Sequence, residues 1–323
     1  VLGPLLARTG KAIVSLPGGC TIGLRPVDIH LKSLEKLGAK IFIEKGYIYA
    51  EALKGLKGNK IIFPKVSVGA TINVLMAAVL AKGTTEIYNA AKEPEIEDLG
   101  LCLRSMGAKI QGLGTNKILV EGVTKLKETN YKVMFDRIEA GTYALAVAIA
   151  GGEIELIGAE KKLLTYFLNI LENIGVEYIV TENSIIFKRR SNSLNPVDII
   201  TEPYPGFPTD LQAQLMAVMA ISNGTSIITE NIFENRFMHT PELIRMGAKI
   251  KLKGNSAIVE GVKKLKGAEV MATDLRASVS LVLAGLVAEG TTNIDRIYHI
   301  DRGYQDIVKK LQFCGANINR VEL

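Results

Sequence analysis

Residues 37–40 read Leu-Gly-Ala-Lys, and close copies of this tetrapeptide return along the whole 323-residue chain. Self-similarity at a fixed spacing is the signature of a fold built from repeated units. Successive copies are separated by 69, 68, 72 and 68 residues, so the sequence predicts consecutive units of about 70 residues. The later copies are Met-Gly-Ala-Lys at 106–109, Ile-Gly-Val at 174–176, Met-Gly-Ala-Lys at 246–249 and Cys-Gly-Ala-Asn at 314–317.

Each unit repeats the same order of elements around this motif. A helix with apolar residues at positions i, i+3 and i+4 ends at the glycine, which suits a left-handed cap. Short strands with alternating apolar residues follow, such as 40–43, 47–50 and 60–63. Next comes a helix that is apolar on all sides, which is typical of an interior helix. The predicted fold is therefore α/β, with β-α-β-α-β-β units around buried helices at 72–81, 142–150, 211–221 and 277–288.

The phase of the repeat bears on the domain organisation. Residues 1–15 read as the end of a unit, and the first residue is Val1 rather than Met. A prior of roughly 150 residues per domain gives two domains for this length. We therefore expect an incomplete first domain over 1–134, a second domain over 135–323, and a longer parent protein.

Composition excludes several classes of protein. The 39 basic and 33 acidic residues give a charge of +6, but the basic residues form no run, and Trp is absent. Both observations disfavour binding of nucleic acid. Three cysteines without a CxxC pair, and three histidines, disfavour a disulfide framework and a zinc site. The longest apolar stretch, 279–288, is too short to span a bilayer. A cytoplasmic protein without a nucleic-acid or membrane partner is expected.

Chemistry-bearing residues are densest at 16–30, Leu-Pro-Gly-Gly-Cys-Thr-Ile-Gly-Leu-Arg-Pro-Val-Asp-Ile-His. Gly18 and Gly19 permit a tight turn and close approach of the backbone to a ligand. Cys20 follows them on this loop near Arg25, and a nearby cation favours the reactive thiolate. Cys20 is therefore predicted to be functional. The other two cysteines, Cys102 and Cys314, fall on apolar helical faces and are expected to be inert.

Further polar clusters stand at the junctions between units, several of them just before an apolar helix. Helix N-termini with Ser, Thr or Asp caps favour anions and hydroxyl groups. The Asp-Arg steps in these clusters are either anion sites or structural ion pairs, and Asp210 is either a helix cap or a general base. The clusters are 65–69, 136–139, 207–210, 233–236, 274–276 and 301–303.

Taken in order, these motifs resemble the UDP-N-acetylglucosamine enolpyruvyl transferase family over the whole chain. The resemblance implies a two-domain inside-out α/β barrel with the site between the domains and a mobile loop that carries Cys20. It also implies transfer of the enolpyruvyl group of phosphoenolpyruvate to the 3′-hydroxyl of UDP-N-acetylglucosamine, with release of phosphate, as the first committed step of peptidoglycan synthesis. The motifs that carry the resemblance are 15–23, 25–28, 65–70, 207–214, 233–239, 271–278 and 295–304.

The resemblance also implies roles for individual residues. Cys20 would protonate C3 of phosphoenolpyruvate, form a covalent adduct with it, and be the residue that fosfomycin alkylates. Asp210 would take the proton of the sugar hydroxyl, and Arg25 and Arg302 would bind phosphoenolpyruvate. The UDP-sugar would be held by Arg25, Pro26, Val27, Asp28, Ile29, Lys65, Val66, Ser67, Val68 and Ile232, and the cleft lined by Arg236, Asp274 and Arg276. No metal or organic cofactor is implied, and a monomer is expected.

Two alternatives remain open at this point. One is the sister reaction with shikimate 3-phosphate as acceptor, which the Cys20 loop disfavours. The other is a non-catalytic repeat protein that binds nucleotide sugars. The resemblance further implies that about 90–100 residues of the family's N-terminal portion, by the repeat spacing, are absent. That portion carries a Lys-Asn pair and an Arg that contact the substrates, so the 323-residue chain alone is expected to be inactive.

Overall fold

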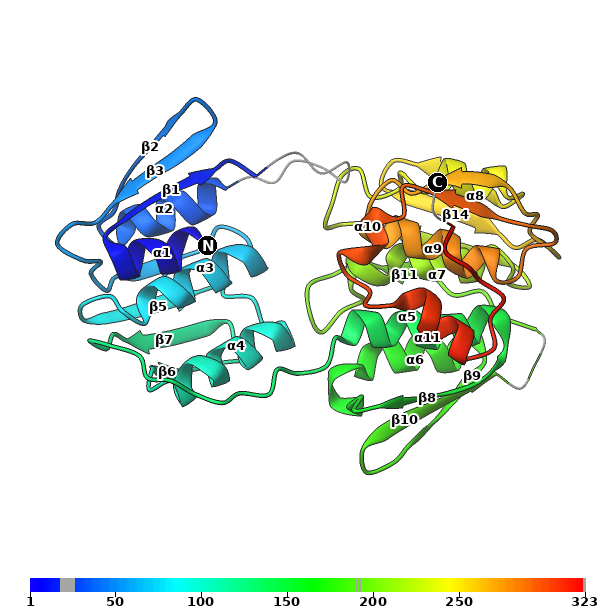
Figure 1. Cartoon of the computed structure of the whole chain (residues 1–323), viewed down its shortest axis with the longest axis horizontal. Helices are drawn as coiled ribbons and strands as arrows, with labels where there is room; N and C mark the ends of the chain where they lie inside the picture. Colours follow the sequence, from blue (N-terminus) through cyan, green and yellow to red (C-terminus); the bar gives the residue numbers. More distant parts are fainter. Residues whose placement is uncertain (18–26, 190, 192, 322–323) are drawn as a thin grey trace. The chain divides into compact units, whose positions relative to one another are not determined.

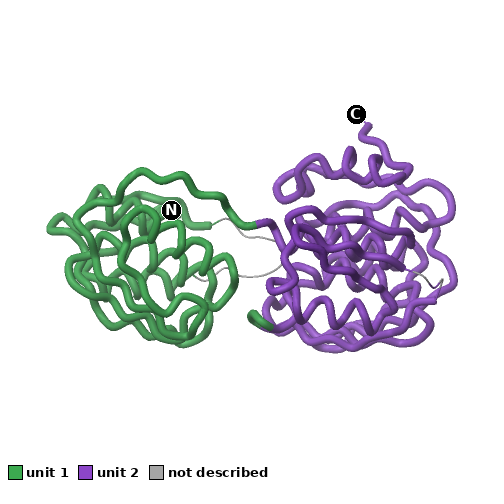
Figure 2. Tube along the Cα trace, turned by 90° about the horizontal axis from the view of Figure 1, so that it is seen from below, with its two compact units in different colours: residues 1–19, 24–134, 203–205 green, residues 20–23, 135–202, 206–323 purple. Residues whose placement is uncertain are grey.

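The computed structural model describes residues 1–17, 27–189, 191 and 193–321. They form two compact units (Figure 2). Unit 1 holds the described residues up to Met134 together with Pro203–Pro205, and unit 2 holds the remainder. Each unit places apolar helices inside and sheets outside, as the fully apolar helical segments predict.

Unit 1 is built around α3 (Val68–Ala78), which packs against α1 (Leu2–Thr9), α2 (Asp28–Lys36) and α4 (Pro94–Ser105). Its core contains Leu34, fully buried on α2. One sheet has the order β1-β3-β2, and the other has the order β4-β5-β7-β6 with β4 and β5 parallel (Figure 1). The strands are β1 (Lys11–Ser15), β2 (Lys40–Glu44), β3 (Tyr47–Glu51), β4 (Lys60–Ile62), β5 (Thr84–Tyr88), β6 (Lys109–Gln111) and β7 (Lys117–Glu121).

Unit 2 has three interior helices that pack against one another, α5 (Arg137–Ala150), α7 (Gln212–Met219) and α9 (Leu275–Gly285). Its sheets have the orders β8-β10-β9, β11-β12-β14-β13 and β15-β16. The strands are β8 (Gly152–Ile157), β9 (Val176–Val180), β10 (Ser184–Arg189), β11 (Ile199–Ile200), β12 (Thr225–Thr229), β13 (Lys249–Lys253), β14 (Ser256–Glu260), β15 (Glu269–Met271) and β16 (Asn293–Asp295). The remaining helices are η1 (Lys161–Leu163), α6 (Thr165–Ile174), η2 (Thr209–Leu211), α8 (Thr240–Arg245), α10 (Tyr298–Asp301) and α11 (Ile307–Phe313).

The predicted repeat is confirmed by the backbone. The five motif glycines all take the left-handed conformation that ends a helix, with φ of 95° at Gly38 and 105° at Gly175. The β4-β5-β7-β6 and β11-β12-β14-β13 sheets share one topology, in which the first pair is parallel and the other pairs are antiparallel. Two of the repeats therefore share the same local fold.

Three of the interior helices begin earlier than predicted. α3, α5 and α9 start at Val68, Arg137 and Leu275, two to five residues before the predicted first residues. A polar side chain just before each helix caps it, so the helix begins before the apolar stretch that periodicity detects. Helix α7 begins at Gln212, after the short turn η2.

The expectation for the two remaining cysteines is wrong in part. Cys314 is exposed, because it follows the end of α11 at the surface, next to Phe313, whose side chain is also exposed. Cys102 on α4 is half-buried. In the part of the chain that the structure describes, no helix is both long enough and apolar enough to cross a membrane.

Candidate functional site

The polar side chains at the starts of α5, α7 and α9 gather where these three helices pack together in unit 2. Asp210, just before α7, lies at the centre of the group. Its Oδ1 accepts a hydrogen bond from Nη2 of Arg236 at 2.7 Å, and its Oδ2 lies 3.5 Å from Nε of Arg276. The two guanidinium groups are buried, but 39% of the Asp210 side chain is exposed. One carboxylate is thus held by two cations and still open to solvent.

Asp210 does not cap a helix. No cap hydrogen bond from its side chain is found at the start of η2 or of α7. Caps are instead supplied by Asp136, which accepts the amides of Ile138 and Glu139, and by Asp274, which accepts those of Arg276 and Ala277. Of the two interpretations of Asp210, the cap is therefore wrong, and its carboxylate is available for chemistry.

Asp274 and Arg276 occupy adjacent places in this group but have different surroundings. The Asp274 carboxylate is buried, and it receives its two amides at 2.9 and 3.0 Å. The Arg276 guanidinium lies 5.3 Å from the ring centroid of Tyr304 and near the charges of Asp210 and Asp136. A cation over an aromatic ring is stabilised when water is largely excluded. Asp274 thus fixes the helix start from which Arg276 extends.

A buried polar network lies behind this pair. The Tyr304 hydroxyl is 2.9 Å from the hydroxyl of Thr142, and Nε2 of Gln214 donates to the backbone oxygen of Asp210 at 2.8 Å. Gln214 also reaches the Tyr304 hydroxyl at 3.3 Å. Burial raises the pKa of Tyr304, although the Arg276 cation opposes this shift. Sequence reasoning missed these residues, although Thr142 and Gln214 stand out as polar side chains within apolar helical segments.

Arg302 and Ile232 lie at the surface of unit 2. Arg302 follows α10 and is exposed. The neighbouring Asp301 pairs with Arg320 at 2.7 Å and not with Arg302, and this contact lowers the pKa of Asp301. Ile232 is 38% exposed in the turn after β12. The structure thus leaves both side chains accessible to a ligand.

The remaining predicted residues fall into two groups. Cys20, Arg25 and Pro26 lie outside the described residues, as do Gly18 and Gly19. The second group lies at the starts of two helices. Ser67 caps α3 by accepting the amide of Ala70 at 3.3 Å, and Asp28 is exposed in the first turn of α2. Lys65, Val66 and Val68 are exposed, Val27 is half-buried, and Ile29 is buried, so only the backbone of Ile29 could reach a ligand.

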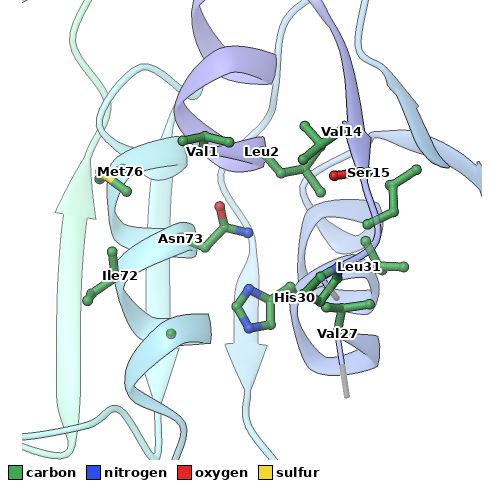
Figure 3. Close-up of a pocket in the computed structure, with 13 residues that line it drawn as sticks. Val1, Leu2, Val14, Ser15, Val27, His30, Leu31, Ile72, Asn73 and Met76 are labelled. Atoms are coloured by element: carbon green, nitrogen blue, oxygen red, sulfur yellow. The ribbon is translucent and has the colours of Figure 1, made fainter. Parts of the chain in front are cut away.

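A pocket of about 230 Å³ also lies in unit 1 (Figure 3). Its walls are mostly apolar, and Val27, His30 and Asn73 line it. Burial lowers the pKa of His30. The Asn73 side chain accepts the amide of Gly3 at 2.7 Å, so its oxygen already has a partner. Among the described residues, no group of three metal-ligating side chains is found here or elsewhere.

Comparison with known proteins identifies the family. The family model of EPSP synthase (3-phosphoshikimate 1-carboxyvinyltransferase) matches residues 1–311. A UDP-N-acetylglucosamine 1-carboxyvinyltransferase of Caulobacter sp. (strain K31) is 59% identical over 322 residues, which cover 100% of this chain and 74% of that protein. The chain belongs to the UDP-N-acetylglucosamine 1-carboxyvinyltransferase family. Another member, from Gluconobacter oxydans (strain 621H), is 60% identical over 99% of this chain and 77% of its own length.

Solved structures agree with this family at the level of the fold. The enolpyruvyl transferase NikO from Streptomyces tendae aligns with a TM-score of 0.84, covering 98% of this chain and 75% of its own. An EPSP synthase from Acinetobacter baumannii aligns with a TM-score of 0.72, covering 100% of this chain and 77% of its own. Their identities of 24% and 22% make these two matches a likeness of fold alone. The predicted enolpyruvyl transferase fold is thereby confirmed.

Proposed function

We propose that this member of the UDP-N-acetylglucosamine 1-carboxyvinyltransferase family transfers the enolpyruvyl group of phosphoenolpyruvate to the 3′-hydroxyl of UDP-N-acetylglucosamine. Phosphate is released, and the product begins peptidoglycan synthesis in the cytoplasm. The observation that carries the proposal in this chain is Asp210, a carboxylate open to solvent between two buried guanidinium groups. Such a group can accept a proton from a bound hydroxyl, and the arginines favour an anionic substrate beside it.

In the proposed mechanism, Asp210 takes the proton of the 3′-hydroxyl while the sugar oxygen bonds to C2 of phosphoenolpyruvate. Cys20 supplies a proton to C3, so the double bond of phosphoenolpyruvate is consumed and a tetrahedral intermediate forms. Loss of phosphate from C2 and of a proton from C3 restores the double bond. Arg25 and Arg302 bind phosphoenolpyruvate in this scheme, and closure of the Cys20 loop excludes water.

The two compact units are proposed to be the two domains of the transferase, and the functional form is proposed to be a monomer. Residues 27–29 and 65–68, at the starts of α2 and α3, are assigned to the UDP-sugar, as is Ile232 of unit 2. The exposed side chains of Asp28, Lys65, Val66 and Val68 and the backbone at these helix starts support this assignment.

Phosphate release tests the proposal. The assay is run on the 323-residue chain and on the complete product of its gene, with phosphoenolpyruvate and either UDP-N-acetylglucosamine or shikimate 3-phosphate. We expect the complete product to release phosphate only with the nucleotide sugar, and fosfomycin to inactivate it with time unless Cys20 is replaced, as in Cys20→Ala. Turnover with shikimate 3-phosphate would instead support the sister reaction. Binding of the nucleotide sugar without any turnover would support the non-catalytic alternative.

A further inference from the structure

We propose that Glu230 is a positioning residue that holds the general base and the sugar-binding turn in a single arrangement. This inference rests on the proposed function. Glu230 directly follows β12, and only 3% of the residue is exposed. A buried carboxylate is unfavourable unless hydrogen bonds satisfy it. Its partners therefore show what the fold uses it for.

The Glu230 carboxylate accepts four hydrogen bonds from three segments of unit 2. On one side, Oε1 accepts the backbone amides of Ile232 at 2.8 Å and Phe233 at 3.1 Å, together with the Thr201 hydroxyl at 2.9 Å. On the other side, Oε2 accepts the Thr209 hydroxyl at 2.9 Å. Thr209 directly precedes Asp210, and Ile232 is the proposed sugar contact. One carboxylate thus fastens the segment of the base to the turn that binds the sugar.

The Asp210 segment and the turn after β12 are also joined by a second set of contacts. The Arg236 guanidinium lies 5.3 Å from the centroid of the Phe233 ring and donates to Asp210 at 2.7 Å. Glu230, Thr209, Asp210, Arg236 and Phe233 therefore form a closed ring of contacts. Within this ring, Glu230 and Arg236 are buried, with 3% and 4% of each residue exposed, and the other three members are half-buried. Releasing either oxygen of Glu230 should let the Asp210–Arg236 pair shift, and a shift of about 1 Å can cost a hundredfold in rate.

The two oxygens of Glu230 predict two different kinetic effects when the variants are made in the complete product of the gene, which is the form expected to be active. Glu230→Ala releases both sides, so kcat should fall by about tenfold to a hundredfold, and KM for UDP-N-acetylglucosamine should rise. Thr209→Val removes only the contact at Oε2, so kcat should fall while that KM is unchanged. Glu230→Gln keeps an oxygen for the three Oε1 contacts, and its amide can donate to the Thr209 hydroxyl. Glu230→Gln and Thr209→Ser should therefore keep kcat within about threefold of the unaltered protein.

Asp198, an exposed residue, offers a control for the loss of a carboxylate that accepts a hydrogen bond from this sheet. Its carboxylate accepts the amide of Ile227 at 2.7 Å on the same strand, β12, and it contacts neither Thr209 nor the turn after β12. Asp198→Ala should destabilise unit 2 as a lost hydrogen bond does, without changing kcat or either KM. A purely structural role for Glu230 would give Glu230→Ala this same pattern. That result, or unchanged kcat in Thr209→Val, would overturn the proposal.

Crystal structures of the variants supply a readout that does not need turnover. The 2.7 Å contact between Asp210 and Arg236 should open in Glu230→Ala and persist in Asp198→Ala. If neither the 323-residue chain nor the complete product of its gene has transferase activity but the contact opens as expected, the proposed function fails and the positioning role of Glu230 stands. If the contact persists in Glu230→Ala, the positioning role is refuted whatever the activity. Should Glu230→Ala not fold, the comparison of Thr209→Val with Thr209→Ser decides.

Discussion

Replacing Asp210 separates its proposed chemical role from its contribution to stability. Asp210→Asn keeps a side-chain oxygen that can accept from Arg236, but it removes the charge and the ability to take a proton. Loss of a general base typically costs about 10²–10⁴ in rate, which corresponds to roughly 3–5 kcal/mol of activation free energy. Turnover should therefore fall by at least a hundredfold.

The cost to folding should be much smaller. A hydrogen bond to a charged group contributes about 1.5–3 kcal/mol and a neutral one about 0.5–1.5, so Asp210→Asn should lower the free energy of unfolding by about 1 kcal/mol. Asp210→Ala also removes the acceptor from Arg236, whose side chain is only 4% exposed. Leaving a buried charge unpaired costs about 3–5 kcal/mol. Because 39% of the Asp210 side chain is exposed, water can replace the lost carboxylate beside Arg236, and Asp210→Ala should lower the free energy of unfolding by about 2 kcal/mol.

Two measurements test these magnitudes on the same samples. Phosphate release gives kcat, and equilibrium urea unfolding gives the free energy of unfolding. The slope of that free energy against urea concentration should be the same in all variants, which shows that only the stability has changed. Asp198→Asn, an equal change of charge in unit 2, should leave kcat unaltered. If Asp210→Asn retained more than about a tenth of kcat while losing the expected stability, Asp210 would be an anchor for the arginines and not the base.

Two further predictions concern stability. His239 is fully buried, and its pKa is lowered to about 4, mainly by burial, so the unfolded chain takes up a proton below pH 6.5 that the folded chain resists. The free energy of unfolding should therefore fall by up to roughly 3 kcal/mol as the pH is lowered from 6.5 to 4. In urea unfolding, the free energy of unfolding of His239→Gln should depend less steeply on pH over this range. An equally steep pH dependence in the variant would show that other groups cause the loss of stability in acid. An added Cβ at Gly261 would lie 1.7 Å from the backbone oxygen of Ser222, so Gly261→Ala should destabilise unit 2 by more than about 3 kcal/mol in calorimetry. Gly285→Ala, whose Cβ would meet its nearest neighbour at 3.4 Å, should change little, and equal losses in the two variants would contradict the steric argument.

The repeat could be predicted from the sequence because its markers act locally. A glycine such as Gly247 ends a helix through its own positive φ, whatever packs around it. A second local marker was available and was missed. Glu-Gly-Val recurs at 121–123 and 260–262, and in both copies an added Cβ on the glycine would collide with a backbone oxygen. Close approach of two backbones needs glycine, so this marker identifies where the end of a repeat packs against the segment that follows its interior helix.

The interior of the site could not be predicted in the same way. Thr142, Gln214 and Tyr304 meet in space although they come from three different repeats. Glu230 gave no signal because an acidic residue after a strand normally reads as an exposed turn. Its burial depends on Thr201 and Thr209, which the strand order of the sheet brings to it. Partners of this kind follow from tertiary packing, which no local pattern in the sequence contains.

The repeat also explains why Asp210 stands apart from its counterparts. Asp136 and Asp274 stand at the starts of α5 and α9, and each uses its carboxylate to cap its helix. Asp210 stands in the corresponding place before α7, but there the short turn η2 comes first and the carboxylate is turned to two arginines. The oxygen of Glu230 that binds Thr209 holds this turn. If the proposed positioning role of Glu230 is correct, this repeat departs from the others because a buried acid fixes the turn before α7, so that the aspartate faces two arginines where its counterparts cap a helix.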